Sequence, residues 1–100
     1  MRREEYKLEL RFNGRVISRL IIDQHYKIAH PEISDELILE LVKMLDGLRR
    51  NVDSENFSFE YYKEEPLIYN NQPYRLVFLI PKGEDFLGII NAFRVRRKIK

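Results

Sequence analysis

The dipeptide Asn13-Gly14, set between two stretches of alternating apolar and polar residues, is the strongest constraint on the fold. Both central residues of a type I′ turn need a positive φ, which asparagine and glycine tolerate best. In residues 6–12 the apolar and charged side chains alternate with the period of two that is typical of a half-buried strand. The sequence therefore predicts a β-hairpin in which residues 6–12 pair with residues 15–22.

Two helices are predicted after the hairpin. Asp23 is a candidate N-cap for a short helix over residues 25–30, which Pro31 must end because the residue before a proline is disfavoured in the α region. A second helix is predicted from Ser34, with acidic residues in its first turn and apolar residues at steps of three and four as far as Leu48. We expect its apolar face to lie across a sheet.

The remainder of the chain is predicted to contain four more strands after a polar connection. The connection covers residues 49–56, and the strands cover residues 57–63, 67–70, 74–80 and 86–95. Strand 74–80 is apolar on both faces, as central strands are. The order ββ-αα-ββββ predicts a single α+β domain over residues 1–100, with a short helix and a longer amphipathic helix on one face of a mostly antiparallel sheet of five to six strands.

Composition excludes several classes of function. The chain has no cysteine, which excludes a thiol nucleophile, a disulfide scaffold and a cysteine-based zinc site. No apolar run approaches the ~20 residues of a membrane-spanning helix, and the first residues are charged where a signal peptide would be apolar. We therefore expect a cytoplasmic protein without membrane contact. The two histidines, His25 and His30, cannot both reach one ion from a regular helix, so no metal site and no cofactor are predicted.

The formal net charge of +2 conceals an uneven distribution. Residues 1–30 carry seven basic and four acidic side chains, residues 31–65 carry four and ten, and residues 66–100 carry seven and two, giving +3, −6 and +5. If the first hairpin adjoins the last strand, a ligand would meet a surface more basic than the total charge indicates. This favours an anionic ligand or an acidic protein partner, and the alternative is a charged surface without function.

Candidate site residues lie on the short helix and on the last strands. The candidates on the helix are His25, Tyr26 and Lys27. Arg75 is the one charged residue inside the apolar strand 74–80. On a final strand with a period of two, Arg94 and Arg96 share a face and lie about 7 Å apart, a spacing that can hold a phosphate; Arg97 extends this basic run.

These residue types suit metal-independent RNA cleavage. The reaction needs one group to deprotonate the ribose 2′-hydroxyl, one to protonate the leaving 5′-oxygen, and fixed cations at the phosphate. We assign candidate catalytic roles to His25, Arg75 and Arg94, and candidate RNA-phosphate binding to Arg96, Arg97, Tyr26 and Lys27. Structural alternatives stay open: a histidine can join the helix to the sheet or complement a helix end, and Arg75 can pair with a nearby glutamate.

In their order these elements resemble the RelE/ParE superfamily of small bacterial toxins, and within it BrnT-like toxins and a related uncharacterised toxin-like family. The likeness rests on His25, on residues 73–78 (PYRLVF) and 88–94 (GIINAFR), and on the basic run after them. It implies a toxin–antitoxin endoribonuclease of the mRNA-interferase type, which acts on RNA, in some members on the ribosome, and is neutralised by a cognate antitoxin. It also implies sheet-borne roles for Arg75, Arg94 and Arg96.

Two other functions remain open at this point. One is a non-enzymatic domain that binds an acidic protein partner or a nucleic-acid backbone through its basic C-terminal strand. The other is a protein that forms a homodimer through an exposed sheet edge. Because the superfamily also includes gyrase-directed toxins, the resemblance does not fix the reaction.

Overall fold

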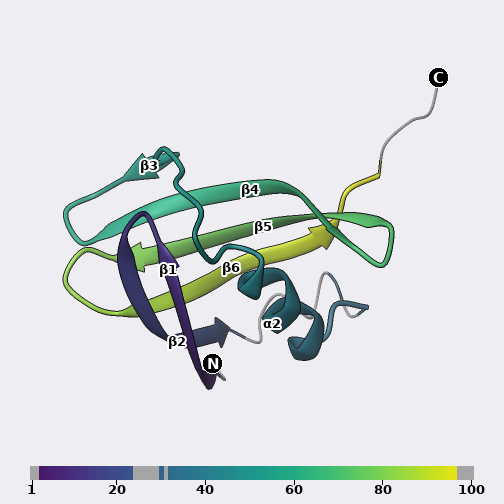
Figure 1. The fold of residues 1–100 in the computed structure, drawn as a ribbon, viewed down its shortest axis with the longest axis horizontal. Helices are drawn as coiled ribbons and strands as arrows, with labels where there is room; N and C mark the ends of the chain where they lie inside the picture. The colour runs from purple at the N-terminus through teal and green to yellow at the C-terminus, as the bar shows by residue number, and fades with distance from the viewer. Residues whose placement is uncertain (1–2, 24–29, 31, 97–100) are drawn as a thin grey trace.

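The computed structural model describes residues 3–23, 30 and 32–96. Within these residues the chain forms a six-stranded sheet and one helix (Figure 1). The strands are β1 (Arg3–Phe12), β2 (Arg15–Asp23), β3 (Ser54–Glu55), β4 (Phe59–Tyr69), β5 (Gln72–Pro81) and β6 (Phe86–Arg94), and the helix is α2 (Asp35–Lys43). The strand order is β1-β2-β6-β5-β4-β3, in which β2 and β6 run parallel and the other neighbours antiparallel.

The predicted fold class is therefore wrong. In place of an α+β domain with two helices on a mostly antiparallel sheet, the described residues form a mostly β structure, a mixed sheet with one helix of nine residues. The short helix predicted over residues 25–30 lies outside the described residues, apart from His30, which belongs to no helix or strand.

The hairpin prediction is confirmed. Strands β1 and β2 pair antiparallel, and Phe12 and Arg15 face each other across the turn. The turn residues Asn13 and Gly14 have φ values of 54° and 76°, as a type I′ turn requires. This turn places Arg15 beside the far strands of the sheet, where it takes part in the polar contacts described below.

Helix α2 begins where it was predicted and ends earlier. The Ser34 hydroxyl accepts a hydrogen bond from the backbone N–H of Leu37 (3.1 Å), which confirms Ser34 as the N-cap. The predicted end near Leu48 is wrong, because the helix stops at Lys43 and the chain then turns back to β1. Gly47, with φ +82°, donates its N–H to a carbonyl of β1 (2.7 Å) and covers part of that edge.

A tyrosine on β1 ties the start of α2 to the sheet. The Tyr6 hydroxyl donates to the Asp35 carboxylate (2.6 Å). Ionisation of the phenol would lose this bond and place two negative charges together, which raises the pKa of Tyr6 to about 12. The phenol therefore stays protonated near neutral pH and holds the helix against β1.

Strand β4 is one long strand where two were predicted. The prediction left residues 64–66 between the strands 57–63 and 67–70, but β4 continues through Pro66 with a shift of register between Glu64 and Leu67. Proline lacks a backbone N–H and is tolerated at such a bulge. The predicted polar connection over residues 49–56 contains the short edge strand β3.

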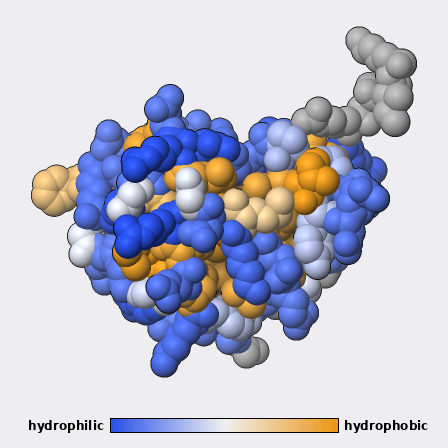
Figure 2. All heavy atoms as spheres, viewed as in Figure 1, coloured by the Kyte–Doolittle hydropathy of each residue, from blue (hydrophilic) through white to orange (hydrophobic). Residues whose placement is uncertain are grey.

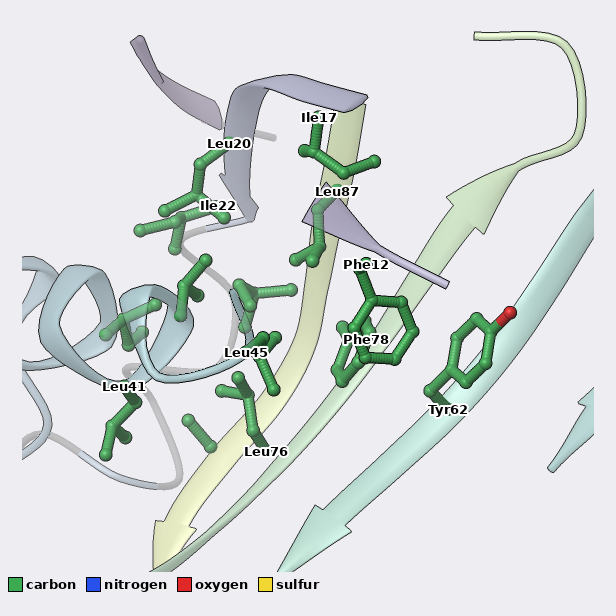
Figure 3. Packing of buried hydrophobic residues seen from close by; sticks show 14 of the residues in the cluster. Phe12, Ile17, Leu20, Ile22, Leu41, Leu45, Tyr62, Leu76, Phe78 and Leu87 are labelled. Atoms are coloured by element: carbon green, nitrogen blue, oxygen red, sulfur yellow. The ribbon is translucent and has the colours of Figure 1, made fainter. Parts of the chain in front are cut away.

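The core lies on the inner face of the sheet, which bends so that the end of β1 packs against β4 and β5 (Figure 3). The Phe12 ring, at the end of β1, lies 5.0 Å from the ring of Tyr62 on β4 and 5.4 Å from that of Phe78 on β5. Helix α2 adds Leu41 and other buried apolar residues to the same cluster. The hairpin and the helix therefore cover one face of strands β4 to β6, and the other face is the outer face of the sheet.

A bulge in β6 changes the predicted faces of the last strand. The register of β5 and β6 shifts between Val77 and Phe78, which leaves Ile90 without a partner in β5. Ala92 is buried while Ile90 is 44% exposed, so the period of two predicted for the final strand is broken at the bulge. Beyond the bulge, Arg94 lies opposite Tyr74 on β5.

Candidate functional site

The C-terminal end of β6 borders a hollow of about 650 Å³, here called the C-terminal hollow. Strand β5 contributes Tyr74, which pairs with Arg94. The backbone N–H of Val95 donates to the carbonyl of Pro73 (2.9 Å) and keeps the chain beside β5 past the end of the strand. The residues that line the hollow are His30, Glu32, Ile33, Tyr74, Phe93, Arg94 and Arg96.

Two of the predicted site residues, Arg94 and Arg96, meet in this hollow. Both side chains are exposed. Arg94 donates to the neutral amide oxygen of Gln72 across 3.5 Å, the limit of a hydrogen bond, and Arg96 has no hydrogen bond or ion pair with any residue that the structure describes. Because arginine stays protonated, each guanidinium brings a positive charge and a planar set of donors to the hollow.

His30 lies in the same hollow, which the sequence had not singled out as a catalytic position. Its ring stacks on that of Phe93, with 5.4 Å between centroids and 22° between planes. Its Nδ1 lies 3.8 Å from a carboxylate oxygen of Glu32, an ion pair when the imidazole is protonated. The side chain is 29% exposed, so it is held in place while still reaching solvent.

Arg75 is not among the residues that line the hollow. Its guanidinium pairs with the carboxylate of Glu65 and lies 5.4 Å from the centre of the Phe93 ring. Arg75 thus contacts the hollow only through Phe93. This arrangement matches the structural alternative for Arg75, pairing with a nearby glutamate, and it leaves little positive charge for a substrate.

Four of the predicted site residues lie outside the described residues: His25, Tyr26, Lys27 and Arg97. Their predicted roles stay predictions. Among the remaining candidates, the structure brings Arg94 and Arg96 together and adds His30 and Tyr74. His30 precedes Pro31, and this position had indicated a helix end; only the fold places it beside Phe93.

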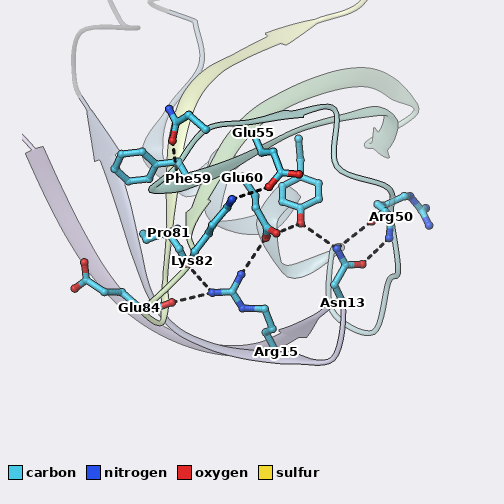
Figure 4. A network of polar contacts seen from close by, with 11 residues as sticks. Asn13, Arg15, Arg50, Glu55, Phe59, Glu60, Pro81, Lys82 and Glu84 are labelled. Carbon is cyan, nitrogen blue, oxygen red and sulfur yellow. Dashed lines mark hydrogen bonds and ion pairs between the residues drawn. The ribbon is translucent and has the colours of Figure 1, made fainter.

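A second group of polar side chains occupies the other end of β5, under the β1–β2 turn (Figure 4). Arg15 pairs with Glu60 (3.1 Å) and donates to the carbonyl of Pro81 (2.6 Å). The Tyr62 hydroxyl donates to the same carboxylate of Glu60 (3.1 Å) and accepts from the amide of Asn13 (3.1 Å). We call these residues, Asn13, Arg15, Glu60 and Tyr62, the hairpin end.

Burial raises the pKa of Tyr62 at the hairpin end, and the hydrogen bond from Asn13 offsets part of that rise. Nearby, Arg50 pairs with Glu64 (2.8 Å). On β2, Arg19 lies 3.2 Å from Asp85, with Glu84 and Glu5 within 3.9 Å. The first hairpin does adjoin the last strand, because β2 pairs with β6. Arg15 and Arg19 of the hairpin are already paired with carboxylates, which leaves less of its positive charge for a ligand.

The chain was compared with known proteins in three ways. No protein-family model, no curated protein and no solved structure matches it. The resemblance to RelE/ParE toxins thus stays a prediction. The described residues include no helix that is long and apolar enough to cross a membrane. Nor do they bring three histidine, aspartate or glutamate side chains together as ligands for a metal ion.

Proposed function

We propose that the protein binds the phosphodiester backbone of RNA in the C-terminal hollow and cleaves it by acid–base catalysis. The observation that carries this proposal is the meeting of Arg94 and Arg96, neither in an ion pair within the described residues, with a histidine in one hollow. Two permanent cations suit a phosphate and the negative charge that develops on it during cleavage. An imidazole suits proton transfer near neutral pH.

Each residue of the hollow has a role in this reaction. His30 takes the proton of the ribose 2′-hydroxyl, the 2′-oxygen attacks phosphorus, and the bond from phosphorus to the 5′-oxygen breaks. The leaving 5′-oxygen must receive a proton, for which the hollow offers the hydroxyl of Tyr74. Arg94 and Arg96 hold the phosphate oxygens throughout. The product ends are a cyclic 2′,3′-phosphate and a free 5′-hydroxyl.

Cleavage of a labelled single-stranded RNA by His30→Ala tests the proposal. Loss of a positioned acid–base group should slow cleavage by about 100-fold or more while the variant keeps the parent's melting temperature. His25→Ala is the matched variant, because it removes the other histidine and tests the role that the sequence gave to His25. A His30→Ala variant that cleaves as fast as the parent would show that His30 takes no part.

The toxin–antitoxin type of this activity is part of the proposal and has its own test. Induced expression of the parent chain should stop growth and degrade cellular RNA, and His30→Ala should do neither. A cognate antitoxin should restore growth by binding over Arg94 and Arg96. Growth arrest that persists in the His30→Ala variant would indicate a toxic effect other than RNA cleavage.

A second candidate function is binding without cleavage, to a nucleic-acid backbone or an acidic protein partner. The stacking of His30 on Phe93 favours it, because that contact gives the histidine a packing role. This candidate predicts binding with a steep salt dependence and no cleavage products. It also predicts that His30→Ala retains most of the affinity for RNA while Arg94→Ala loses it.

A further inference from the structure

A large apolar side chain projects from the turn between β3 and β4. Phe57 is 96% exposed. The turn itself is well ordered by Asn56, whose side-chain oxygen accepts from the backbone N–H groups of Ser58 (2.9 Å) and Phe59 (2.8 Å). These bonds fix the backbone on both sides of the phenyl ring. A partner that buries Phe57 would therefore have little loop entropy to remove.

The outer face of the sheet carries an apolar hollow of about 200 Å³, here called the outer hollow. Part of this space exists because Gly88 on β6 has no side chain: a Cβ there would lie 3.1 Å from Leu79 on β5. A cavity of about 150 Å³ lined by leucine, isoleucine and phenylalanine accepts a benzene ring. The residues that line the outer hollow are Arg3, Ile21, Asp23, Phe59, Leu79, Phe86, Gly88, Ile89 and Ile90.

The charges around the outer hollow favour an apolar occupant over a nucleic acid. Arg19, whose guanidinium lies 5.5 Å from the centre of the Phe86 ring, also lies close to Asp85, Glu84 and Glu5. Lys63, on the outer face of β4, lies 3.7 Å from Asp53. Arg3, which lines the outer hollow, lies opposite Asp23 on β2, and Asp23 lines it too. Each of these cations thus has a carboxylate close by, and the outer hollow presents no concentrated positive charge to a phosphate backbone. On the face seen in Figure 2 as well, hydrophobic residues reach the surface in patches between hydrophilic ones.

We propose that a second copy of the chain docks here, with Phe57 of each copy inserted into the outer hollow of the other. The chain carries both the projecting ring and the hollow, and they lie close together, since Phe59 lines the hollow two residues after Phe57. Two copies related by a single two-fold axis can therefore bury both Phe57 rings at once. This proposal does not depend on RNA binding, which concerns the C-terminal hollow.

The dimer is expected to be weak. One phenylalanine buries about 150–250 Å². Two such rings and the residues around them fall short of the ~1,600 Å² of a standard stable interface. Association is therefore expected in the micromolar range or weaker, and it is visible only when the protein concentration is varied.

Sedimentation velocity from about 1 μM to about 1 mM protein tests the proposal. The parent chain should pass from monomer to dimer. Phe57→Ser should weaken association by roughly 100-fold, because two rings lose their burial. The matched control is Ile68→Ser, which removes another exposed apolar side chain (51% exposed) at the opposite end of β4 and should leave association unchanged.

A second variant fills the hollow and leaves Phe57 in place. Gly88→Ala adds a methyl group against the flexible end of Leu79, and it should weaken association about tenfold with little change in the melting temperature. A parent chain that stays monomeric at all concentrations, or a Phe57→Ser variant that dimerises like the parent, overturns the proposal. A Phe57→Ser variant that loses RNA affinity from a monomeric parent would assign the ring to nucleic-acid binding instead.

Discussion

The two ends of β5 carry arginines in opposite electrostatic situations. At the hairpin end, Arg15 gives its donors to Glu60 and to backbone carbonyls. At the C-terminal hollow, within the part of the chain that the structure describes, Arg94 meets only a neutral amide at 3.5 Å and Arg96 meets no partner. Similar side chains thus support the fold at one end and remain available to a ligand at the other. The position of the acidic residues, more than the count of basic ones, decides which arginines can bind.

The largest expected effect on stability comes from Phe12, whose ring packs against Tyr62 of the hairpin end. Phe12→Ala should lower the free energy of unfolding by about 3–5 kcal/mol, because Phe12 is fully buried against Tyr62 and Phe78. Phe93→Ala, at the C-terminal hollow, should cost less than half as much because Phe93 is only partly buried. Urea denaturation measures both. Equal losses would contradict the division into a structural and a ligand-binding end.

The charged contacts of the hairpin end should have the next largest effect. Glu60→Gln keeps the shape but removes the charge that Arg15 and Tyr62 share, and it should cost about 1–2 kcal/mol in urea denaturation. Glu32→Gln, at the C-terminal hollow, should change stability by less than about 0.5 kcal/mol, since Glu32 is exposed and lies 3.8 Å from His30. A larger loss of stability from Glu32→Gln than from Glu60→Gln would contradict the assignment of the structural role to the hairpin end.

The arginines themselves should follow the same division. Arg15→Ala should destabilise the protein by about 1–2 kcal/mol, because it removes the cation beside Glu60 and the side-chain donor to the carbonyl of Pro81. Arg94→Ala should stay within about 0.5 kcal/mol of the parent. Thermal unfolding followed by circular dichroism gives both values. A marked loss on Arg94→Ala would show that Arg94 has a structural role.

The smallest effect concerns pH. The hydrogen bonds from Ser18 and Arg19 hold the pKa of Asp85 below its ordinary value of 3.8. A carboxyl whose pKa is lower in the folded state stabilises the fold above the unfolded value and loses that contribution as the pH falls through the folded value. The parent should therefore lose more stability than Asp85→Asn between about pH 5 and about pH 2. Identical pH profiles would contradict this role of Asp85.

The sequence predicted the hairpin turn and the start of α2. The Asn13-Gly14 turn and the Ser34 cap have backbone requirements that neighbouring residues alone satisfy. The parallel pairing of β2 with β6 joins residues as distant as Arg19 and Phe86, and it has no local signal. The early end of α2 could not be predicted from neighbouring residues either, because the hydrogen bond from Gly47 to β1 is a tertiary contact.

The candidate site was predictable only in part. Arg94 and Arg96 lie two residues apart, so their meeting follows from chain geometry even though the strand ends at Arg94. His30 reaches the hollow by packing on Phe93, far away in the chain. The pairing of Arg75 with Glu65 depends on how β4 and β5 lie together. Each of these contacts needed the three-dimensional arrangement.

The most direct test of the central claim measures RNA affinity against salt concentration for the parent and two variants. Fluorescence anisotropy with a labelled single-stranded RNA should show at least a tenfold loss of affinity, and a salt slope smaller by about one to two, for the double variant Arg94→Ala/Arg96→Ala. Arg19→Ala should bind like the parent, because Arg19 is already paired with acidic residues. An unchanged double variant, or an equal loss on Arg19→Ala, would contradict the account.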